Sequence, residues 1–449
     1  MSSFEPSAIK TFRFVSYSFN DETNQAEFCY AFDNGHRFIE RLTFHNARPP
    51  QNRKARRALF TALRYLHLVL GVSYYKAAVP ESIRIETAPV TEQCAYFFDK
   101  LYLHGLAEFA YRNQLDLRKR IRFPFSKYSA AKPESLQLPK RTAIPVGGGK
   151  DAVVTIDAFQ RAGQAPVLFA LGDFQPIKEI AKISKLPLIN VTRQISPALI
   201  KLNEQGAYNG HVPISAIIAF VLPVCAILYG FDTAALSNER SADSGNLIHN
   251  GFSVNHQYSK SMEFEKDAAH FFKKYILSDF NYCSFLRPLS DLHIARLFSK
   301  LDAYHPVFMS CNRAFKLDRQ KRLQRWCLDC PKCRFTFLVL APFIAKTKLI
   351  ALFGTNLLDD MEQRQGFDQL LGVSGFKPFE CVGEIEESAA AFILLTQNLQ
   401  WRDDCLVRRF KTKILPGLDN PEQMVKTALA FSDSHQLTCQ YEEILRAYL

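Results

Sequence analysis

The chain has 449 residues, of which 47% are hydrophobic and 22% are charged. This length allows two or three domains with buried cores, and the composition is too apolar for a disordered protein. The 56 Lys and Arg residues exceed the 44 Asp and Glu residues, which gives a net charge of +12. Such an excess fits a polyanionic ligand, although a solvated basic surface explains it equally well.

The eleven cysteines are an odd number in a long chain, which disfavours a secreted disulfide framework and favours a reducing compartment. Residues 1–10 are polar and lack the basic start and apolar run of a signal peptide. We therefore expect a cytoplasmic protein.

The amino-terminal region combines strand and helix patterns. Residues 10–44 predict three strands with turns at residues 20–24 and 33–35, and residues 53–70 and 91–112 predict helices. We expect an α+β domain over residues 1–130. Residues 118–141 are rich in Pro, Ser and basic side chains, which fits a linker or a phosphate-binding loop.

The central region alternates short apolar runs at residues 142–146, 167–171, 186–191 and 233–237 with helix-length segments. This alternation predicts an α/β fold with a doubly wound parallel sheet over residues 131–340. Ligands of such sheets bind beyond the carboxyl ends of the strands. Functional residues should therefore follow the strands.

One segment, residues 212–231, is almost continuously apolar and as long as a membrane span. Pro223 interrupts it and no basic cluster flanks it, so we favour a buried helix and expect no membrane span. The tail, residues 341–449, is predicted to be mainly helical, most clearly at residues 385–397 and 421–431.

The loop Gly147-Gly148-Gly149-Lys150-Asp151 leaves a predicted strand and enters a predicted helix. Three glycines let backbone N–H groups converge at a helix amino terminus, which makes a cradle for phosphate. No Walker spacing is present, but Gly147, Gly149 and Ala152 fit a dinucleotide fingerprint, with Asp173 after the next strand. Asp151 favours ATP, because Mg²⁺ makes a carboxylate beside phosphates useful.

A second polar cluster follows the strand at residues 233–237. It is expected at the same crevice, with Asn238, Arg240 and Ser241 as nucleotide contacts. General acid or base catalysis needs a titratable side chain, for which the cluster offers Glu239, His256, Tyr258, Lys260 and Glu263. For each of them alone, a structural hydrogen bond or a solvated charge is the competing explanation.

A cysteine cluster, Cys311, Cys327, Cys330 and Cys333, supplies the four thiolates of a closed tetrahedral zinc site. A redox pair would not need three closely spaced cysteines and a fourth upstream. We therefore predict structural Zn²⁺.

These motifs resemble known families. Residues 144–152 are similar to the phosphate loop of N-type ATP pyrophosphatases, Ser-Gly-Gly-x-Asp-Ser, except that Gly147 and Ala152 replace the serines. The cysteine cluster is similar to the zinc site of 7-cyano-7-deazaguanine synthases, which are ATP pyrophosphatases. The resemblance implies an ATP pyrophosphatase-like core.

Four stretches in order, residues 144–152, 237–265, 311–334 and 377–387, resemble the family of bacterial UDP-N-acetylmuramoyl-L-alanyl-L-glutamate epimerases. The resemblance implies inversion of the terminal L-glutamate through an acyl-adenylate, with ATP and Mg²⁺ consumed. The partners are then ATP and the UDP-N-acetylmuramoyl-dipeptide, without nucleic acid. Cys381 joins Asp151, Glu239, His256 and Glu263 as a candidate catalytic residue, although a buried structural cysteine is the alternative.

Two other functions stay open. ATP pyrophosphatases with zinc elements often activate nucleobases, so an RNA- or nucleobase-modifying enzyme fits the same motifs and the basic charge. A non-catalytic nucleotide-binding protein is a third possibility, which Asp151 and the cluster after residue 237 disfavour.

Overall fold

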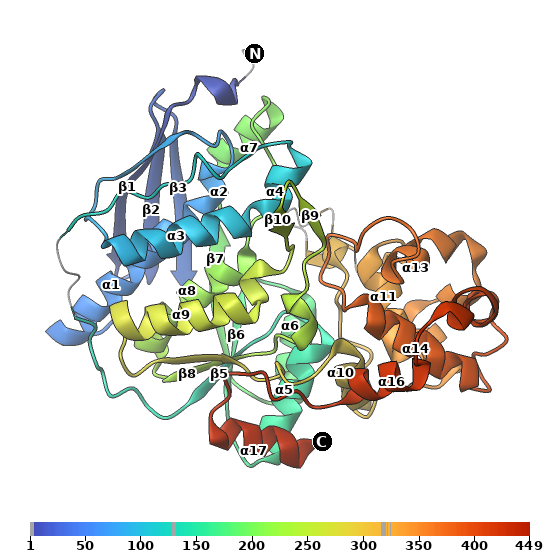
Figure 1. The fold of residues 1–449 in the computed structure, drawn as a ribbon. Helices are drawn as coiled ribbons and strands as arrows, with labels where there is room; N and C mark the ends of the chain where they lie inside the picture. Colours follow the sequence, from blue (N-terminus) through green and yellow to red (C-terminus); the bar gives the residue numbers. More distant parts are fainter. Residues whose placement is uncertain (1–3, 128–131, 316–319, 321, 324) are drawn as a thin grey trace.

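The computed structural model describes residues 4–127, 132–315, 320, 322–323 and 325–449. The domain boundary expected between residues 130 and 131 lies outside the described residues. The described residues form one nine-stranded sheet and a two-stranded hairpin, surrounded by helices (Figure 1).

The large sheet has the strand order β11-β8-β5-β6-β7-β3-β2-β1-β4. The strands are β1 (Thr11–Asn20), β2 (Gln25–Phe32), β3 (Arg37–Phe44), β4 (Ser82–Ile85), β5 (Thr142–Pro145), β6 (Val167–Leu171), β7 (Leu188–Gln194), β8 (Thr233–Leu236) and β11 (Asn281–Ser284). From β11 to β7 all neighbours are parallel, whereas β7, β3, β2 and β1 pair antiparallel. The predicted α/β class and the predicted strands are confirmed.

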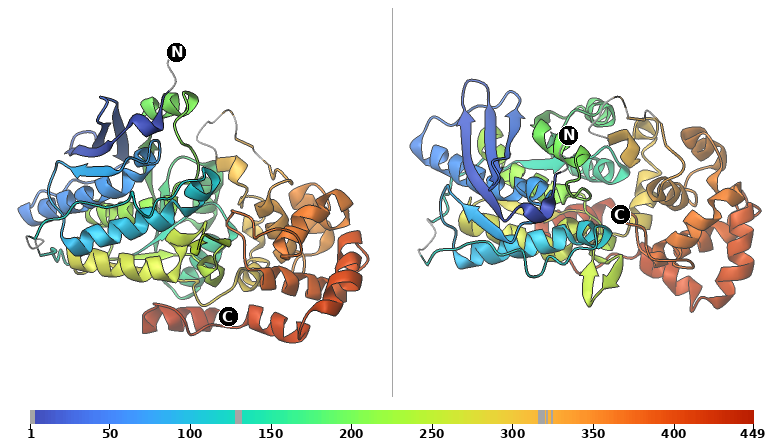
Figure 2. Two further views of the ribbon diagram at one scale, coloured as in Figure 1. Left: turned by 45° about the horizontal axis from the view of Figure 1, so that its top comes forward. Right: turned by 90° about the horizontal axis from the view of Figure 1, so that it is seen from above.

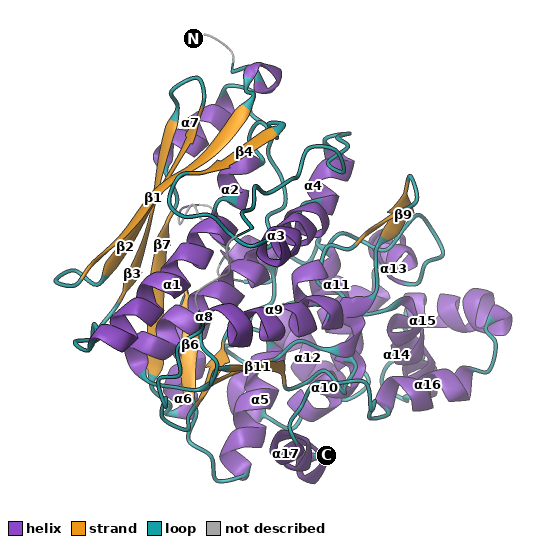
Figure 3. Ribbon diagram, turned by 60° about the vertical axis from the view of Figure 1, so that its left-hand side comes forward, coloured by secondary structure: helices purple, strands orange, loops and turns teal. Residues whose placement is uncertain are grey.

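The amino-terminal strands do not form a sheet of their own. β3 pairs with β7, with Phe44 opposite Val191, so the antiparallel strands extend the parallel sheet without a break. Figure 3 shows this continuous sheet, with β1, β2 and β3 beside β7 and β6.

The alternating side chains of the parallel strands enter two separate cores, because successive residues of a strand point to opposite faces. Ala143 and Ala234 belong to one core, while Ile144 and Ala235 belong to the other. Helices therefore cover both faces of the parallel strands, as expected for a doubly wound sheet.

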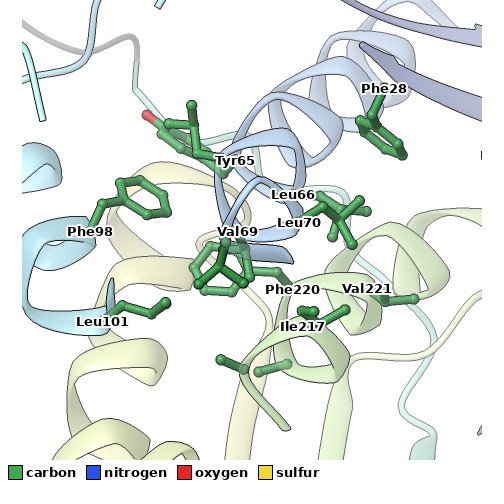
Figure 4. Close-up of a cluster of buried hydrophobic side chains, with 14 of the residues drawn as sticks. Phe28, Tyr65, Leu66, Val69, Leu70, Phe98, Leu101, Ile217, Phe220 and Val221 are labelled. Carbon is green, nitrogen blue, oxygen red and sulfur yellow. The ribbon is translucent and has the colours of Figure 1, made fainter. Parts of the chain in front are cut away.

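The first core is formed with α1 (Arg53–Leu70), α3 (Glu92–Gly105), α8 (Ile214–Tyr229) and α9 (Met262–Tyr275). Figure 4 shows Leu66 and Val69 of α1 near Ile217 and Phe220 of α8. The predicted buried helix is confirmed as α8, whose side chains, Pro223 included, are mostly buried. Within the described residues, the model contains no helix with the length and apolarity needed to cross a membrane.

The second core joins α5 (Lys150–Arg161) and α6 (Gln175–Ser184) to α10 (Asp291–Phe298) and the carboxy-terminal helices. Figure 2 shows most of these later helices gathered at one side of the sheet, whereas the last helix of the chain lies apart from them and packs on α5. They are α11 (Pro331–Leu340), α12 (Lys346–Phe353), α13 (Arg364–Leu370), α14 (Ile385–Gln397), α15 (Cys405–Arg409), α16 (Pro421–Leu429) and α17 (Cys439–Tyr448). The helices predicted near residues 385–397 and 421–431 are α14 and α16.

The remaining elements are short. They are α2 (Val72–Tyr75), α4 (Ala107–Arg112), α7 (Pro197–Glu204) and the hairpin of β9 (Leu247–His249) and β10 (Phe252–Val254). The helix predicted at residues 91–112 is divided at Leu106 into α3 and α4.

Candidate active site

A cavity of about 300 Å³ opens where β5, β6 and β8 end. The chain crosses from β5 to β6 on one side, whereas β8 lies on the other side of β5, so the cavity lies at a topological switch point of the sheet. Its apolar wall includes Phe169, Leu171, Ile218, Leu236 and Met309. Its polar wall includes Gly147, Gly149, Asp151, Asn238, Lys260 and Lys332.

The glycine loop forms one end of this cavity. Gly148 has φ +87°, and its carbonyl accepts a 2.8 Å hydrogen bond from the backbone N–H of Met309. A Cβ on Gly148 would lie 2.9 Å from the Phe315 ring, and one on Gly149 would lie 2.9 Å from Ser310 Oγ. The side chains of Phe315 and Ser310 thus approach too closely for a side chain at either position, so both positions require glycine.

Lys150 points away from the cavity. Its buried ammonium donates to Asp151 at 2.5 Å and also to Asp291, at the start of α10. These two carboxylates raise the pKa of Lys150 although burial alone would lower it. Lys150 therefore fixes the position of Asp151, whose side chain is 33% exposed and lines the cavity.

Hydroxyl groups from outside the loop stand beside it. Ser237, after β8, and Ser310 both line the cavity, and Ser237 Oγ lies 2.8 Å from Thr155 Oγ1 of α5. These hydroxyl groups are suited to the phosphate contacts that serines would make at the positions of Gly147 and Ala152.

The cluster after β8 is divided between several places. Asn238 lines the cavity and donates to Ser284 Oγ at 3.0 Å. Glu239 is buried, and its charge contributes to raising the pKa of Lys260. Arg240 donates to the Thr427 carbonyl, and Ser241 is buried.

Glu263 lies on α9 outside the cavity lining. Its carboxylate pairs with Lys100 at 2.6 Å and its side chain is 56% exposed. This environment is that of a surface ion pair.

Cys381 lies next to the cavity through Lys260, whose Nζ is 3.5 Å from Cys381 Sγ. His256 hydrogen-bonds Cys381 and, through Nδ1, lies 2.5 Å from Glu108 Oε2 of α4. The loop before α9 therefore contacts the thiol through two side chains, and α4 contacts one of these, His256.

The charges around the thiol shift its protonation. Burial would raise the pKa of Cys381, but Lys260, Lys332 and His256 hold it well below its usual value. Burial would likewise lower the pKa of His256, but its hydrogen bonds to Cys381 and Glu108 raise it to about 9. An imidazolium and a thiolate are thus favoured together at neutral pH.

The four predicted zinc ligands come together. The Sγ atoms of Cys311, Cys327, Cys330 and Cys333 all lie within 4.8 Å of one another. Sulfurs around tetrahedral zinc are roughly 3.8 Å apart, given Zn–S bonds of about 2.3 Å. Cys327 and Cys333 are 3.7 Å apart, and Cys330 and Cys333 are 3.4 Å apart, so the set fits a structural zinc ion.

This cysteine cluster also shapes the cavity. Ser310 and Asn312 flank Cys311, and Lys332 lies between Cys330 and Cys333. Ser310, Asn312 and Lys332 all line the cavity.

Glu108, Lys332 and Asp291 were not predicted from the sequence. Glu108 stands in the apolar run Ala107-Glu108-Phe109-Ala110 and is only 6% exposed, and a charge on a buried helix face is the one signal that marks it. Lys332 lies inside the cysteine motif, which predicts metal ligands and gives no separate signal for a lysine.

Comparisons with known proteins place the chain in a family. The model of the MurL N-terminal domain matches residues 3–285, and that of the MurL C-terminal domain matches residues 307–424. The UDP-N-acetyl-alpha-D-muramoyl-L-alanyl-L-glutamate epimerase of Xanthomonas oryzae pv. oryzae is 41% identical over 447 residues, covering 100% of this chain and 99% of that protein. Proteins of the same name from Micromonospora sp. and Salinispora tropica are 42% and 40% identical, over 88% and 87% of this chain and 89% and 86% of their own lengths. Matches that span both regions of the chain show that it belongs to the MurL family.

Proposed function

We propose that this chain inverts the terminal L-glutamate of UDP-N-acetylmuramoyl-L-alanyl-L-glutamate, and that it consumes ATP to do so. The observation that carries the proposal is the end-to-end similarity to relatives named as this epimerase. It favours epimerisation over the modification of RNA or nucleobases. A cytoplasmic location follows for an enzyme that acts on a nucleotide-linked precursor.

The cavity beside the glycine loop supports an ATP pyrophosphatase-like nucleotide site. Its apolar wall suits the adenine ring, and the loop N–H groups suit the phosphates. Asp151 is placed to bind Mg²⁺ at the phosphates, and Lys260 and Lys332 offer positive charge on the same wall. The cysteine cluster holds structural Zn²⁺ in this proposal and keeps that wall in place.

ATP is needed because a glutamate α-hydrogen beside a carboxylate is scarcely acidic. Transfer of AMP to the carboxylate releases pyrophosphate and removes that negative charge. The α-proton then leaves to a base, and the electron pair of the C–H bond enters an enolate that Lys260 can stabilise. A proton returns on the opposite face, and water releases AMP from the D-glutamyl product.

Cys381 is the base that best fits the geometry, with His256 as its partner. The 3.5 Å contact from Lys260 places the thiol next to the wall where the acyl group would form.

The decisive experiment incubates the UDP-N-acetylmuramoyl-dipeptide with Mg-ATP in D₂O. We expect deuterium at the glutamate α-carbon while AMP and pyrophosphate accumulate, and neither product without ATP. Free glutamate should react poorly, because it lacks the remote groups whose binding orients the adenylate. Inversion without ATP, or ADP in place of AMP, would disprove the adenylation scheme.

A further inference from the structure

Cys381 is surrounded by charged side chains from several elements. His256 and Lys260 both lie in the loop before α9, and Lys332 lies on α11. Glu108 lies next to His256, and Glu380, the neighbour of Cys381 in the chain, acts electrostatically on both His256 and Cys381. The positive groups nevertheless outweigh the negative ones at the sulfur.

Glu108 is built into this arrangement. It is 6% exposed, one of its oxygens lies 2.5 Å from His256 Nδ1, and the other accepts from Arg112 Nε at 2.7 Å. His211 Nδ1 is 3.5 Å from the same carboxylate. A buried carboxylate needs such partners, and holding Nδ1 leaves the other ring nitrogen of His256 for Cys381.

We infer that Glu108 is a positioning residue that fixes a protonated His256 against Cys381, so that Cys381 is a thiolate before substrate binds. Its catalytic meaning rests on the proposed function: the thiolate takes the α-proton of the adenylated glutamate. In that step the α C–H bond breaks, an S–H bond forms, and the C–H electron pair enters the enolate.

The protonation states agree with this arrangement. Burial would raise the pKa of Glu108, but its hydrogen bond to His256 lowers it, so the carboxylate is ionised at neutral pH. Burial and the neighbouring His256 lower the pKa of His211 to about 4. At neutral pH the pair of histidines thus carries a single positive charge, and it resides on His256, the ring that contacts the thiol.

A preformed thiolate has a signature that does not depend on turnover. Thiolates react with iodoacetamide and thiols do not, so the labelling rate follows the ionised fraction. Cys381 is partly exposed, and Cys439 on α17 is fully exposed, so Cys439 serves as a reference within the same molecule.

The experiment labels the folded full-length chain without substrates from about pH 6 to about pH 9 and locates the label by mass spectrometry. Cys381 should react at a rate that changes little with pH, whereas the rate of an ordinary thiol such as free cysteine rises with pH. Glu108→Gln should lower the labelling of Cys381 at pH 7 about tenfold, which is the loss expected when the thiol pKa rises to about one unit above the pH of the assay. Glu108→Asp should restore part of the loss.

A matched control separates this role from general destabilisation. Glu40 is also buried and paired with an arginine, Arg193, at 2.6 Å, but it lies on β3. Glu40→Gln should lower stability and leave the pH profile of Cys381 unchanged.

Three results would overturn the inference. The first is a wild-type Cys381 labelling rate that rises with pH as that of free cysteine does, and the second is a profile that Glu108→Gln leaves unchanged. The third is a second bound metal ion that Glu108→Gln removes, since Glu108, His211 and His256 would then be ligands. Labelling needs no substrate, so the two proposals can fail separately. Deuterium exchange by a protein whose Cys381 is not a preformed thiolate would refute this inference alone. A preformed thiolate in a protein that catalyses no exchange would refute the proposed function alone.

Discussion

The glycine loop and the surroundings of Cys381 meet at Lys260, yet they are built in different ways. The loop is one uninterrupted stretch, Gly147 to Asp151, and its properties come from backbone conformation and close packing. The Cys381 site is assembled from α4, the loop before α9, α11 and the segment before α14, and its properties come from charge. The first site should therefore be sensitive to shape, and the second to charge and pH.

Cys381→Ala should separate the two sites most sharply. Without the thiol, deuterium exchange at the glutamate α-carbon should fall about 10³-fold, within the range for loss of a general base. AMP formation should persist, because adenylation uses the other end of the cavity. The ratio of deuterium to AMP measures the separation, with Cys439→Ala, at an exposed thiol, as the control. Equal loss of both products would show that the two sites do not act separately.

Asp151→Asn should have the converse effect. Removing the carboxylate that faces the phosphates should reduce AMP formation about 10²- to 10³-fold, and exchange should fall with it because exchange follows adenylation. Circular dichroism should show a folded protein. Asp157→Asn is the control on the same helix, where the carboxylate bonds Tyr448. Normal turnover by Asp151→Asn would remove this residue from the mechanism.

Zinc should support the wall that the two sites share. The purified protein should contain about one zinc ion per chain, and Cys330→Ser should lose it together with thermal stability. AMP formation and exchange should then decline together, because Lys332 and Ser310 are both anchored next to ligands. Cys405→Ser, outside the cluster, should retain the metal. A wild-type metal content near zero would contradict the zinc site.

Gly148→Ala tests the shape requirement of the loop. The new Cβ would meet the Phe315 ring at 2.9 Å in a backbone conformation with φ +87°, so the Michaelis constant for ATP should rise about tenfold. Gly163→Ala is a matched control, since φ is +70° there and nothing lies within 4 Å of the added atom. It should cost about 1 kcal/mol of stability without changing ATP affinity. Similar ATP constants for both variants would show that loop shape is unimportant.

The smallest effect concerns pH. Because the pKa of Cys381 is held well below its ordinary value, the thiolate is already formed at pH 7 and raising the pH adds no further base. The exchange rate should change by no more than about twofold between about pH 7 and about pH 8.5, and it should fall only as pH drops through the lowered pKa. An ordinary thiol would instead give a rise approaching tenfold per pH unit in this range.

The same contrast explains what the sequence could predict. Gly147 to Asp151 forms its structure locally, between a strand and a helix, so spacing alone marks it. Glu108 acts through its hydrogen bond to His256, which is 148 residues away in the chain, and no local sequence pattern predicts that contact. Glu263 has the right chemistry in the right segment, but α9 directs it toward Lys100.

The fold shows a similar limit. The strands β5 to β8 follow from their apolar runs, whereas β11 has the sequence Asn-Tyr-Cys-Ser without such a run and pairs with β8 in the fold. The pairing of β3 with β7 joins segments about 150 residues apart, and such a contact is decided by packing rather than by propensity.

That pairing has a mechanical consequence. Since β3 and β7 share hydrogen bonds, the amino-terminal strands and the strand that carries the glycine loop belong to one stiff plate. Bending it between its halves would break backbone hydrogen bonds, so the two halves cannot swing as separate bodies. Any adjustment to a bulky substrate must then come from elements outside the sheet, such as the segment between α13 and α14 that carries Cys381.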